Sequence, residues 1–140
     1  MQAKGINVVL TREPGGTDLG EKIRQLLLST QTQPMHSDSE LLLMFAARNE
    51  HIHHKIIPAL KKGDWVLSDR FTDASYAYQG GGRGLDIERI EHLERWVLGD
   101  FTPDMTLLLD IPVDLGMSRV ESRGEKDRIE LEAKDFFWAS

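Results

Sequence analysis

Runs of consecutive apolar residues mark the chain at Ile6 to Leu10, Trp65 to Ser68 and Met105 to Asp110. None of these runs alternates with polar positions, which is typical of short strands that are covered on both faces. The long segments between them have a helical period instead. The pattern therefore predicts a parallel sheet with crossover helices, which is the α/β class.

The helical segments carry start and stop signals of their own. Apolar residues at helical spacing follow Thr17, a predicted N-cap. A second helix is expected over residues 39–61, with Gly63 just past its end. A third is expected over residues 86–98, capped by its first residue and closed by Gly99. The expected apolar face of the second helix comprises Leu42, Phe45, Ala46, Asn49, Ile52 and Ile56.

The composition bounds the class of protein. A chain of 140 residues that is 40% apolar and 29% charged is expected to form a single soluble domain, residues 1–140. It has no apolar run of about 18 residues and no basic segment leading into an apolar one at its N-terminus, so the expected location is the cytoplasm, with no membrane contact. The absence of cysteine excludes disulfides, thiolate nucleophiles and cysteine-based zinc sites.

The net charge of −6 argues against non-specific binding to nucleic acid, which needs a basic face, but it is compatible with a local cationic pocket. Residues 69–84, DRFTDASYAYQGGGRG, follow the second apolar run. An acid and an arginine at a strand end, followed by hydroxyls, an amide and glycines, place anion-binding groups at the carboxyl edge of the sheet, where open α/β sheets bind ligands.

Residues 11–17, TREPGGT, join the first strand to a helix in the same way. Their glycines allow a close approach of the backbone, and the helix N-terminus favours an anion. The alternative is a tight turn in which Arg12 and Glu13 face solvent. Residues 43–48, LMFAAR, place an aromatic ring about one turn before an arginine, which suits a nucleobase, although apolar residues at this spacing are usually core.

Two other features of the sequence are more simply explained without a functional role. The charge-dense residues 119–130 are typical of a solvated helix end. His51, His53 and His54 stand at positions i, i+2 and i+3 of a helix and do not converge on one metal ion as positions i and i+4 do, so no metal site is expected.

Taken together, these motifs resemble bacterial thymidylate kinases, members of the P-loop nucleoside-monophosphate kinase family, over nearly all of residues 5–137. The resemblance implies a three-layer parallel sheet with flanking helices, phosphoryl transfer from ATP to thymidine 5′-monophosphate (dTMP) with Mg²⁺, and a homodimer. It implies catalytic roles for Asp69, Arg70, Arg123 and Arg128. It implies substrate contacts from Arg12, Glu13, Arg24, Phe45, Arg48, Ser75, Tyr78 and Gln79.

The resemblance also implies how these roles divide. Arg70 would neutralise charge between the acceptor phosphate and the transferred group, with Asp69 supporting it or a metal-bound water. The residues implied at the phosphate and sugar are Arg12, Glu13 and Arg24, with Tyr78 over the deoxyribose. Those implied at the base are Ser75, Gln79, Arg48 and a stacking residue. Counting back from Arg48 and Pro58 puts Met44 at the stacking position, so both Met44 and Phe45 are candidates.

In the family, residues 119–130 correspond to a mobile lid that supplies catalytic arginines, with Arg119 behind Arg123 and Arg128. The chain departs from relatives at Glu121, where a basic residue is common. It also contains no Gly-x-x-x-x-Gly-Lys-[Ser/Thr] motif. By the resemblance, that loop and the first strand would precede Met1, and a last strand would follow the chain, so the sheet is expected to be incomplete.

Both ends of the chain have features of a longer domain, a helix-end pattern in residues 1–5 and an apolar cluster in residues 136–138. The alternative is that Gly5 begins the fold and the aromatic tail docks. We expect the chain to keep most groups that contact dTMP and to be inactive alone. The other hypotheses are a catalytically dead dTMP-binding module and a structural dimerisation partner, which would use the apolar faces in residues 42–56 and 90–97.

Overall fold

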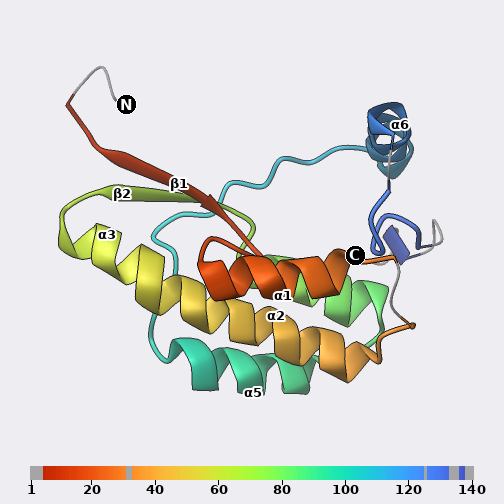
Figure 1. The fold of residues 1–140 in the computed structure, drawn as a ribbon, viewed down its shortest axis with the longest axis horizontal. Helices are drawn as coiled ribbons and strands as arrows, with labels where there is room; N and C mark the ends of the chain where they lie inside the picture. The colour runs from red at the N-terminus through yellow and green to blue at the C-terminus, as the bar shows by residue number, and fades with distance from the viewer. Residues whose placement is uncertain (1–4, 31–32, 125, 133–135, 138–140) are drawn as a thin grey trace.

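The computed structural model describes residues 5–30, 33–124, 126–132 and 136–137. Strands β1 (Val8–Arg12) and β2 (Trp65–Asp69) pair in parallel and lie beside a layer of helices (Figure 1). The last residue of β1, Arg12, is opposite the last residue of β2, Asp69. The first two predicted strands form and run in parallel, although the first begins two residues later than predicted. The prediction that both faces are covered is wrong, because Leu10, Trp65 and Leu67 are more than half exposed on strands that lack one covering layer in the described part of the chain. Both strands lead into their loops at the same edge of the sheet.

The predicted caps are confirmed for two helices. Helix α1 (Asp18–Leu28) begins after Thr17, whose hydroxyl oxygen accepts a hydrogen bond of 3.0 Å from the Gly20 N–H. Helix α5 (Ile87–Leu98) begins after Asp86, whose carboxylate accepts one from the Glu88 N–H, and Gly99 ends it with a φ of +58°. Both signals are local in sequence, which is why they could be predicted.

The predicted long helix is also confirmed, with an irregular middle. It consists of α2 (Ser37–His51), the π-helical segment η2 (Ile52–Ile56) and α3 (Ile57–Lys61), which follow one another without a break. Pro58 near its end has no N–H to donate, and its ring crowds the carbonyl one turn earlier, so the wider π-turn before it accommodates the ring.

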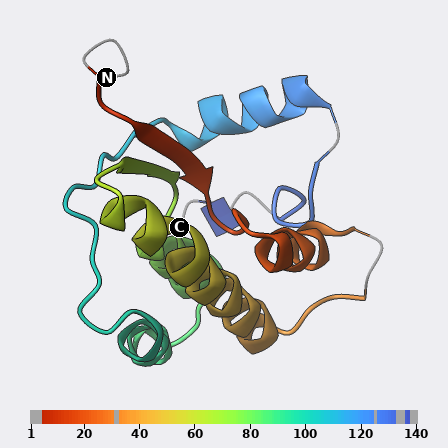
Figure 2. The same ribbon diagram turned by 60° about the vertical axis from the view of Figure 1, so that its left-hand side comes forward.

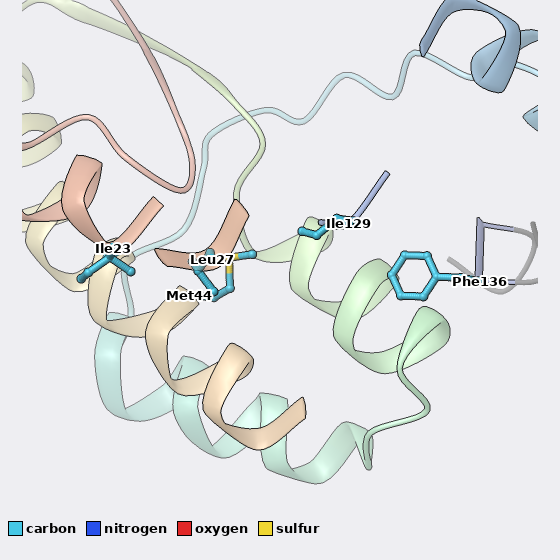
Figure 3. Packing of buried hydrophobic residues seen from close by; sticks show 6 residues of the cluster. Ile23, Leu27, Met44, Ile129 and Phe136 are labelled. Atoms are coloured by element: carbon cyan, nitrogen blue, oxygen red, sulfur yellow. The ribbon is translucent and has the colours of Figure 1, made fainter. Parts of the chain in front are cut away.

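Helix α2 lies between α1 and α5 in both views (Figures 1 and 2) and contributes to two apolar clusters. The α1–α2 cluster contains Ile23, Leu27, Met44, Ala47, Ile129 and Phe136 (Figure 3). The α2–α5 cluster contains Leu41, Phe45, Ile52, Ile56, Ile90 and Leu98. The predicted apolar face of this helix was therefore only partly right, because Leu42 and Ala46 are exposed while Leu41 and Ala47 are buried.

The prediction of a third strand at Met105 to Asp110 is wrong. This segment has no regular structure, and Leu108 and Leu109 are 88% and 90% exposed. In the described part of the chain, β1 and β2 pair only with each other, so this segment has no neighbouring strand. An apolar run indicates what a strand could bury, but a strand forms only where a neighbour completes its backbone hydrogen bonds.

The remaining elements are α4 (Thr72–Ser75) and the π-helical η3 (Tyr76–Gly82), which follow β2, and α6 (Val113–Arg123). Helix α6 stands away from the helical layer in both views (Figures 1 and 2). Among the described residues, no helix has the length and apolar character needed to cross a membrane.

Neighbouring leucines of α1 provide a test of the α1–α2 cluster. Leu27 is fully buried, whereas Leu26 is 51% exposed. We expect Leu27→Ala to lower the free energy of unfolding by roughly 2–5 kcal/mol and Leu26→Ala by less than about 1 kcal/mol, because only the first substitution leaves a cavity. Urea unfolding of both variants measures this, and equal losses would contradict the packing described.

Candidate functional site

The loops that follow β1 and β2 are joined at the carboxyl edge of the sheet. The Glu13 N–H donates to the Asp69 carbonyl at 3.0 Å. Arg70 has a φ of +72°, a backbone conformation that residues other than glycine rarely adopt. At this residue the chain turns from β2 toward α4. In the first loop, a Cβ added to Gly16 would lie 2.6 Å from the His51 ring, so this position has no room for a side chain.

A buried polar network holds the first loop against α2. The Arg48 Nε donates to Glu13 Oε2 at 2.7 Å, and His51 Nδ1 lies 3.0 Å from the other oxygen, Oε1. His51 Nε2 lies 2.6 Å from Thr11 Oγ1 on β1. The side chains of Glu13, Arg48 and His51 are 0–4% exposed. Glu13, predicted near the phosphate and sugar, thus has both carboxylate oxygens engaged inside the fold.

Arg48 reaches beyond Glu13 to the segment after β2. Its Nη1 donates to Ser75 Oγ at 3.1 Å, and its Nη2 donates to the Phe71 carbonyl at 3.1 Å. One guanidinium therefore connects α2, the loop after β1 and the loop after β2. This is the arrangement in which the fork of donors on arginine is most useful.

Guanidinium groups gather beside this network. Arg24 Nη1 donates to the Pro14 carbonyl at 3.1 Å. Burial, and then the positive charges of Arg12 and Arg70, lower the pKa of Arg24. Arg12 forms a half-exposed ion pair with Glu21 at 3.0 Å, and the Arg70 Cζ lies 5.3 Å from the centre of the Tyr78 ring. Cations held near one another in this way favour an anionic ligand, which would offset their repulsion.

A small cavity of about 20 Å³ lies next to these arginines. The predicted site residues on its wall are Glu13, Arg48, Arg70, Ser75, Tyr78 and Gln79. Met44 also lines it, whereas Phe45 is 1% exposed and packs in the α2–α5 cluster. The volume has room for about one water molecule, so a nucleobase can enter only if part of the wall moves.

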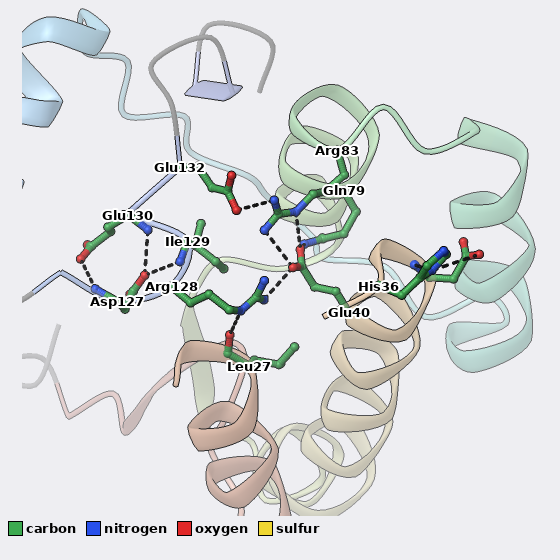
Figure 4. A network of polar contacts seen from close by, with 11 residues as sticks. Leu27, His36, Glu40, Gln79, Arg83, Asp127, Arg128, Ile129, Glu130 and Glu132 are labelled. Carbon is green, nitrogen blue, oxygen red and sulfur yellow. Dashed lines mark hydrogen bonds and ion pairs between the residues drawn. The ribbon is translucent and has the colours of Figure 1, made fainter. Parts of the chain in front are cut away.

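One wall residue of this cavity, Ile129, comes from the segment of residues 126–132, which is fastened to α2 through Glu40 (Figure 4). Arg128 Nη2 donates to Glu40 Oε2 at 2.6 Å, and its Nε donates to the Leu27 carbonyl at 2.7 Å. Glu40 also accepts from Gln79 Nε2 at 2.8 Å and from Arg83 Nη2 at 3.0 Å. Arg83 in turn bonds Glu132.

Burial alone would raise the pKa of Glu40, but the hydrogen bonds from Gln79, Arg83 and Arg128 outweigh it, so the pKa lies below its ordinary value. Glu40 is therefore a charged carboxylate with no exposed surface. The guanidinium of Arg128, predicted to act on phosphate, is turned to this carboxylate and to α1.

The other predicted residues lie farther from this cluster or outside what is described. Asp69 is exposed, and among the described residues its carboxylate forms no ion pair with Arg70. Arg119 is exposed on α6, which ends at Arg123, and the side chain of Arg123 lies outside the described part of the structure. Of the end patterns, residues 1–4 and 138 lie outside the described residues, whereas Phe136 packs in the α1–α2 cluster and Phe137 lies against it.

The histidines separate in the structure, since His51 is buried while His53 and His54 are exposed. Within the described ranges, no three His, Asp or Glu side chains converge as a metal site built from the protein alone would require.

Sequence reasoning missed two residues that shape the site. Glu40, in the first turn of α2, was not singled out, and His51 was considered only as one of three clustered histidines. The available signal was the helical spacing of Glu40, Met44 and Arg48, which places them on one face.

Comparisons with known proteins agree with the geometry. The sequence model of the family described as thymidylate kinase matches residues 1–139. The chain is 80% identical over 134 residues to the thymidylate kinase of Ruthia magnifica, covering 96% of this chain and 65% of that protein. It is 58% identical over 139 residues to that of Ectopseudomonas mendocina, covering 99% of this chain and 66% of that protein.

Among solved structures, the crystal structure of thymidylate kinase from Ehrlichia chaffeensis superposes with a TM-score of 0.70 at 44% sequence identity. The alignment covers 83% of this chain and 60% of that one. The chain thus spans about 65% of the length of the curated relatives it matches.

The buried ion pair has an exposed counterpart of nearly equal length. Arg48 and Glu13 lie 2.7 Å apart with side chains 3% and 4% exposed, and Arg89 and Asp38 lie 2.8 Å apart with side chains 60% and 43% exposed. We expect Arg48→Met to cost roughly 3–5 kcal/mol, because it leaves a buried carboxylate unpaired, and Arg89→Met about 0–1 kcal/mol. Urea unfolding compares them, and similar losses would refute the structural role of Arg48.

Proposed function

The chain belongs to the thymidylate kinase family, and we propose that it supplies the part of such a kinase that binds dTMP and positions it for phosphoryl transfer from ATP, giving dTDP and ADP. The observation that carries the proposal is the grouping of Arg12 and Arg70, at the carboxyl ends of β1 and β2, with Arg24, which α1 brings to the loop after β1. A nucleoside monophosphate carries a phosphate dianion, which supplies the negative charge that would offset the positive charges of these three arginines.

The proposed roles follow from the placement of each group. Arg24, and Arg12 once it leaves Glu21, bind the phosphate of dTMP. Arg70 has no carboxylate partner in the described part of the chain, and it neutralises the charge that develops between the acceptor phosphate and the transferred group. Asp69 stands at the same strand end, with an exposed carboxylate that is available to support the reacting groups.

The cavity beside these arginines is the proposed base pocket. Ser75 and Gln79 bind the polar edge of thymine, and Met44 offers an apolar wall for its face. Tyr78 lies toward the sugar, and Phe45 supports the pocket from behind, with the Arg48 Cζ 4.7 Å from the centre of its ring. Glu13 acts through Arg48 and His51, since both of its oxygens are engaged by them.

ATP and Mg²⁺ belong to the proposal as the phosphate donor and its metal ion. Mg²⁺ supplies positive charge to phosphate oxygens when it is bound. The sequence contains no P-loop motif, so we propose that these residues bind dTMP by themselves but do not transfer phosphate by themselves. Arg123 and Arg128 are proposed to act on the transferred phosphate, which requires Arg128 to leave Glu40.

We also propose that two copies associate as a homodimer. The apolar faces in residues 42–56 and 90–97, which are expected to pair, are partly buried within one copy, because Ile90 packs with Phe45. Leu42 and Trp96 remain 55% and 82% exposed and are available to a second copy. We expect sedimentation velocity to show a dimer that Trp96→Glu dissociates, while Leu115→Glu, at an exposed leucine of α6, does not. A monomeric parent chain would contradict this proposal.

Ligand binding tests the proposed function directly. We expect millimolar dTMP to raise the thermal midpoint by several degrees, and uridine 5′-monophosphate, which carries a ribose and lacks the methyl group, to raise it much less, because a ligand stabilises the state that binds it. Arg24→Met should weaken dTMP binding at least tenfold through loss of a charged contact. Arg95→Met, at an exposed arginine of α5, is the matched control.

No response to dTMP, or an equal response to both nucleotides, would refute the proposal. Binding without any transfer, in a protein that also carries a P-loop, would instead favour a catalytically dead dTMP-binding module.

A further inference from the structure

The side-chain amide of Gln79 can take only one orientation in this structure. Gln79 is 1% exposed, and its Nε2 donates to Glu40 Oε1 at 2.8 Å. An ionised carboxylate can only accept hydrogen bonds, so it requires the amino side of the amide, and the carbonyl oxygen must point the other way. The orientation of the amide therefore follows from the charge of Glu40.

Glu40 is held in its ionised form by two cations from different segments. Arg83 Nη2 and Arg128 Nη2 donate to its Oε2 at 3.0 and 2.6 Å. Both guanidinium groups are always charged, and the carboxylate is fully buried between them (Figure 4). A neutral Glu40 would leave the largely buried Arg128 without a carboxylate partner among the described residues and would leave Arg83 with Glu132 alone, so the charged form is strongly favoured.

The carbonyl oxygen of Gln79 is free for a ligand. Gln79 lines the cavity, and its Oε1 accepts no hydrogen bond from a described residue. No buried side-chain oxygen in the described parts lacks a partner, so Oε1 is not sealed in the interior and opens on the cavity. The cavity wall therefore presents a hydrogen-bond acceptor at this point.

Ser75 presents the opposite polarity one helical turn earlier. Its Oγ accepts a hydrogen bond of 3.1 Å from Arg48 Nη1, so its hydroxyl hydrogen remains available to donate. Ser75 also lines the cavity, and positions i and i+4 of a helical segment lie on one face. Ser75 and Gln79 together offer a donor beside an acceptor.

We propose that Glu40 is a positioning residue that fixes the Gln79 amide with its oxygen toward the cavity and so selects a pyrimidine with a ring N–H beside a carbonyl oxygen. Thymine has this edge at N3 and O4. Cytosine has the reverse, a bare ring nitrogen beside an amino group, which would set acceptor against acceptor. The inference rests on the proposed function, namely that this cavity receives the base.

The test uses two nucleotides that differ only at this edge, dTMP and 5-methyl-2′-deoxycytidine 5′-monophosphate. Calorimetric titration gives the dissociation constant of each for the parent protein, Glu40→Gln and Glu40→Asp. We expect the parent protein to prefer dTMP by at least about 100-fold, and Glu40→Gln to reduce this preference about tenfold or more, because a neutral amide can present either polarity to Gln79. Glu40→Asp retains the charge and should retain the preference.

Glu132→Gln is the matched control. Glu132 contacts Arg83 in the same network but does not contact Gln79, so its substitution should leave the preference unchanged. A purely structural role of Glu40 would weaken both nucleotides equally. An unchanged ratio in Glu40→Gln would therefore overturn the inference.

A second measurement does not require a variant that folds. In the parent protein, the side-chain amide protons of Gln79 should exchange with water much more slowly than those of Gln25, which is exposed on α1. Equal exchange rates would overturn the inference even if dTMP binds. A parent protein that binds neither nucleotide would refute the proposed function, while the exchange measurement would still report on the Glu40 contact.

Discussion

The ion pair between Glu13 and Arg48 sets the position of the loops around the candidate site. Both side chains are almost fully buried, and a buried charge without its partner costs several kcal/mol. Since the same guanidinium also bonds Ser75 and the Phe71 carbonyl, the loop after β1, helix α2 and the segment after β2 cannot shift independently. His51 adds a link from Glu13 to Thr11 on β1 itself.

Helix α2 can hold the loops in place because its two buried faces have different roles, one in apolar packing and one in polar contacts. Leu41 and Phe45 pack toward α5, whereas Glu40, Met44 and Arg48 follow one another at four-residue spacing on another face. On that second face a carboxylate and a guanidinium stand two turns apart with an apolar side chain between them. The helix thereby places Met44 and Arg48 on the cavity wall and, through Glu40, holds the wall residue Gln79.

What could be predicted from the sequence was local. The N-caps Thr17 and Asp86 and the end glycines Gly63 and Gly99 lie next to the helices they delimit, and the apolar runs of β1 and β2 needed only each other. The strand predicted at residues 105–110 was wrong because a strand needs a neighbouring strand to pair with, and the local composition does not show whether one is present.

The same distinction explains the site. The two loop motifs were visible because each is continuous in sequence. Glu40 and His51 were not, because their partners Gln79 and Glu13 lie 39 and 38 positions away. The choice between Met44 and Phe45 could not be made from spacing alone, since adjacent helical positions point about 100° apart and only the packing decides which one faces the cavity.

The distribution of charge separates arginines that hold the fold from arginines available to a ligand. Arg48 is matched by Glu13, Arg83 by Glu40 and Glu132, and Arg128 by Glu40, so in this structure their charges are balanced inside the molecule. Within the described residues, Arg24 and Arg70 have no such carboxylate. The chain has a net charge of −6, so these arginines form a small positive site on an otherwise negatively charged protein. Such a site attracts a small dianion, while the rest of the surface repels an extended polyanion.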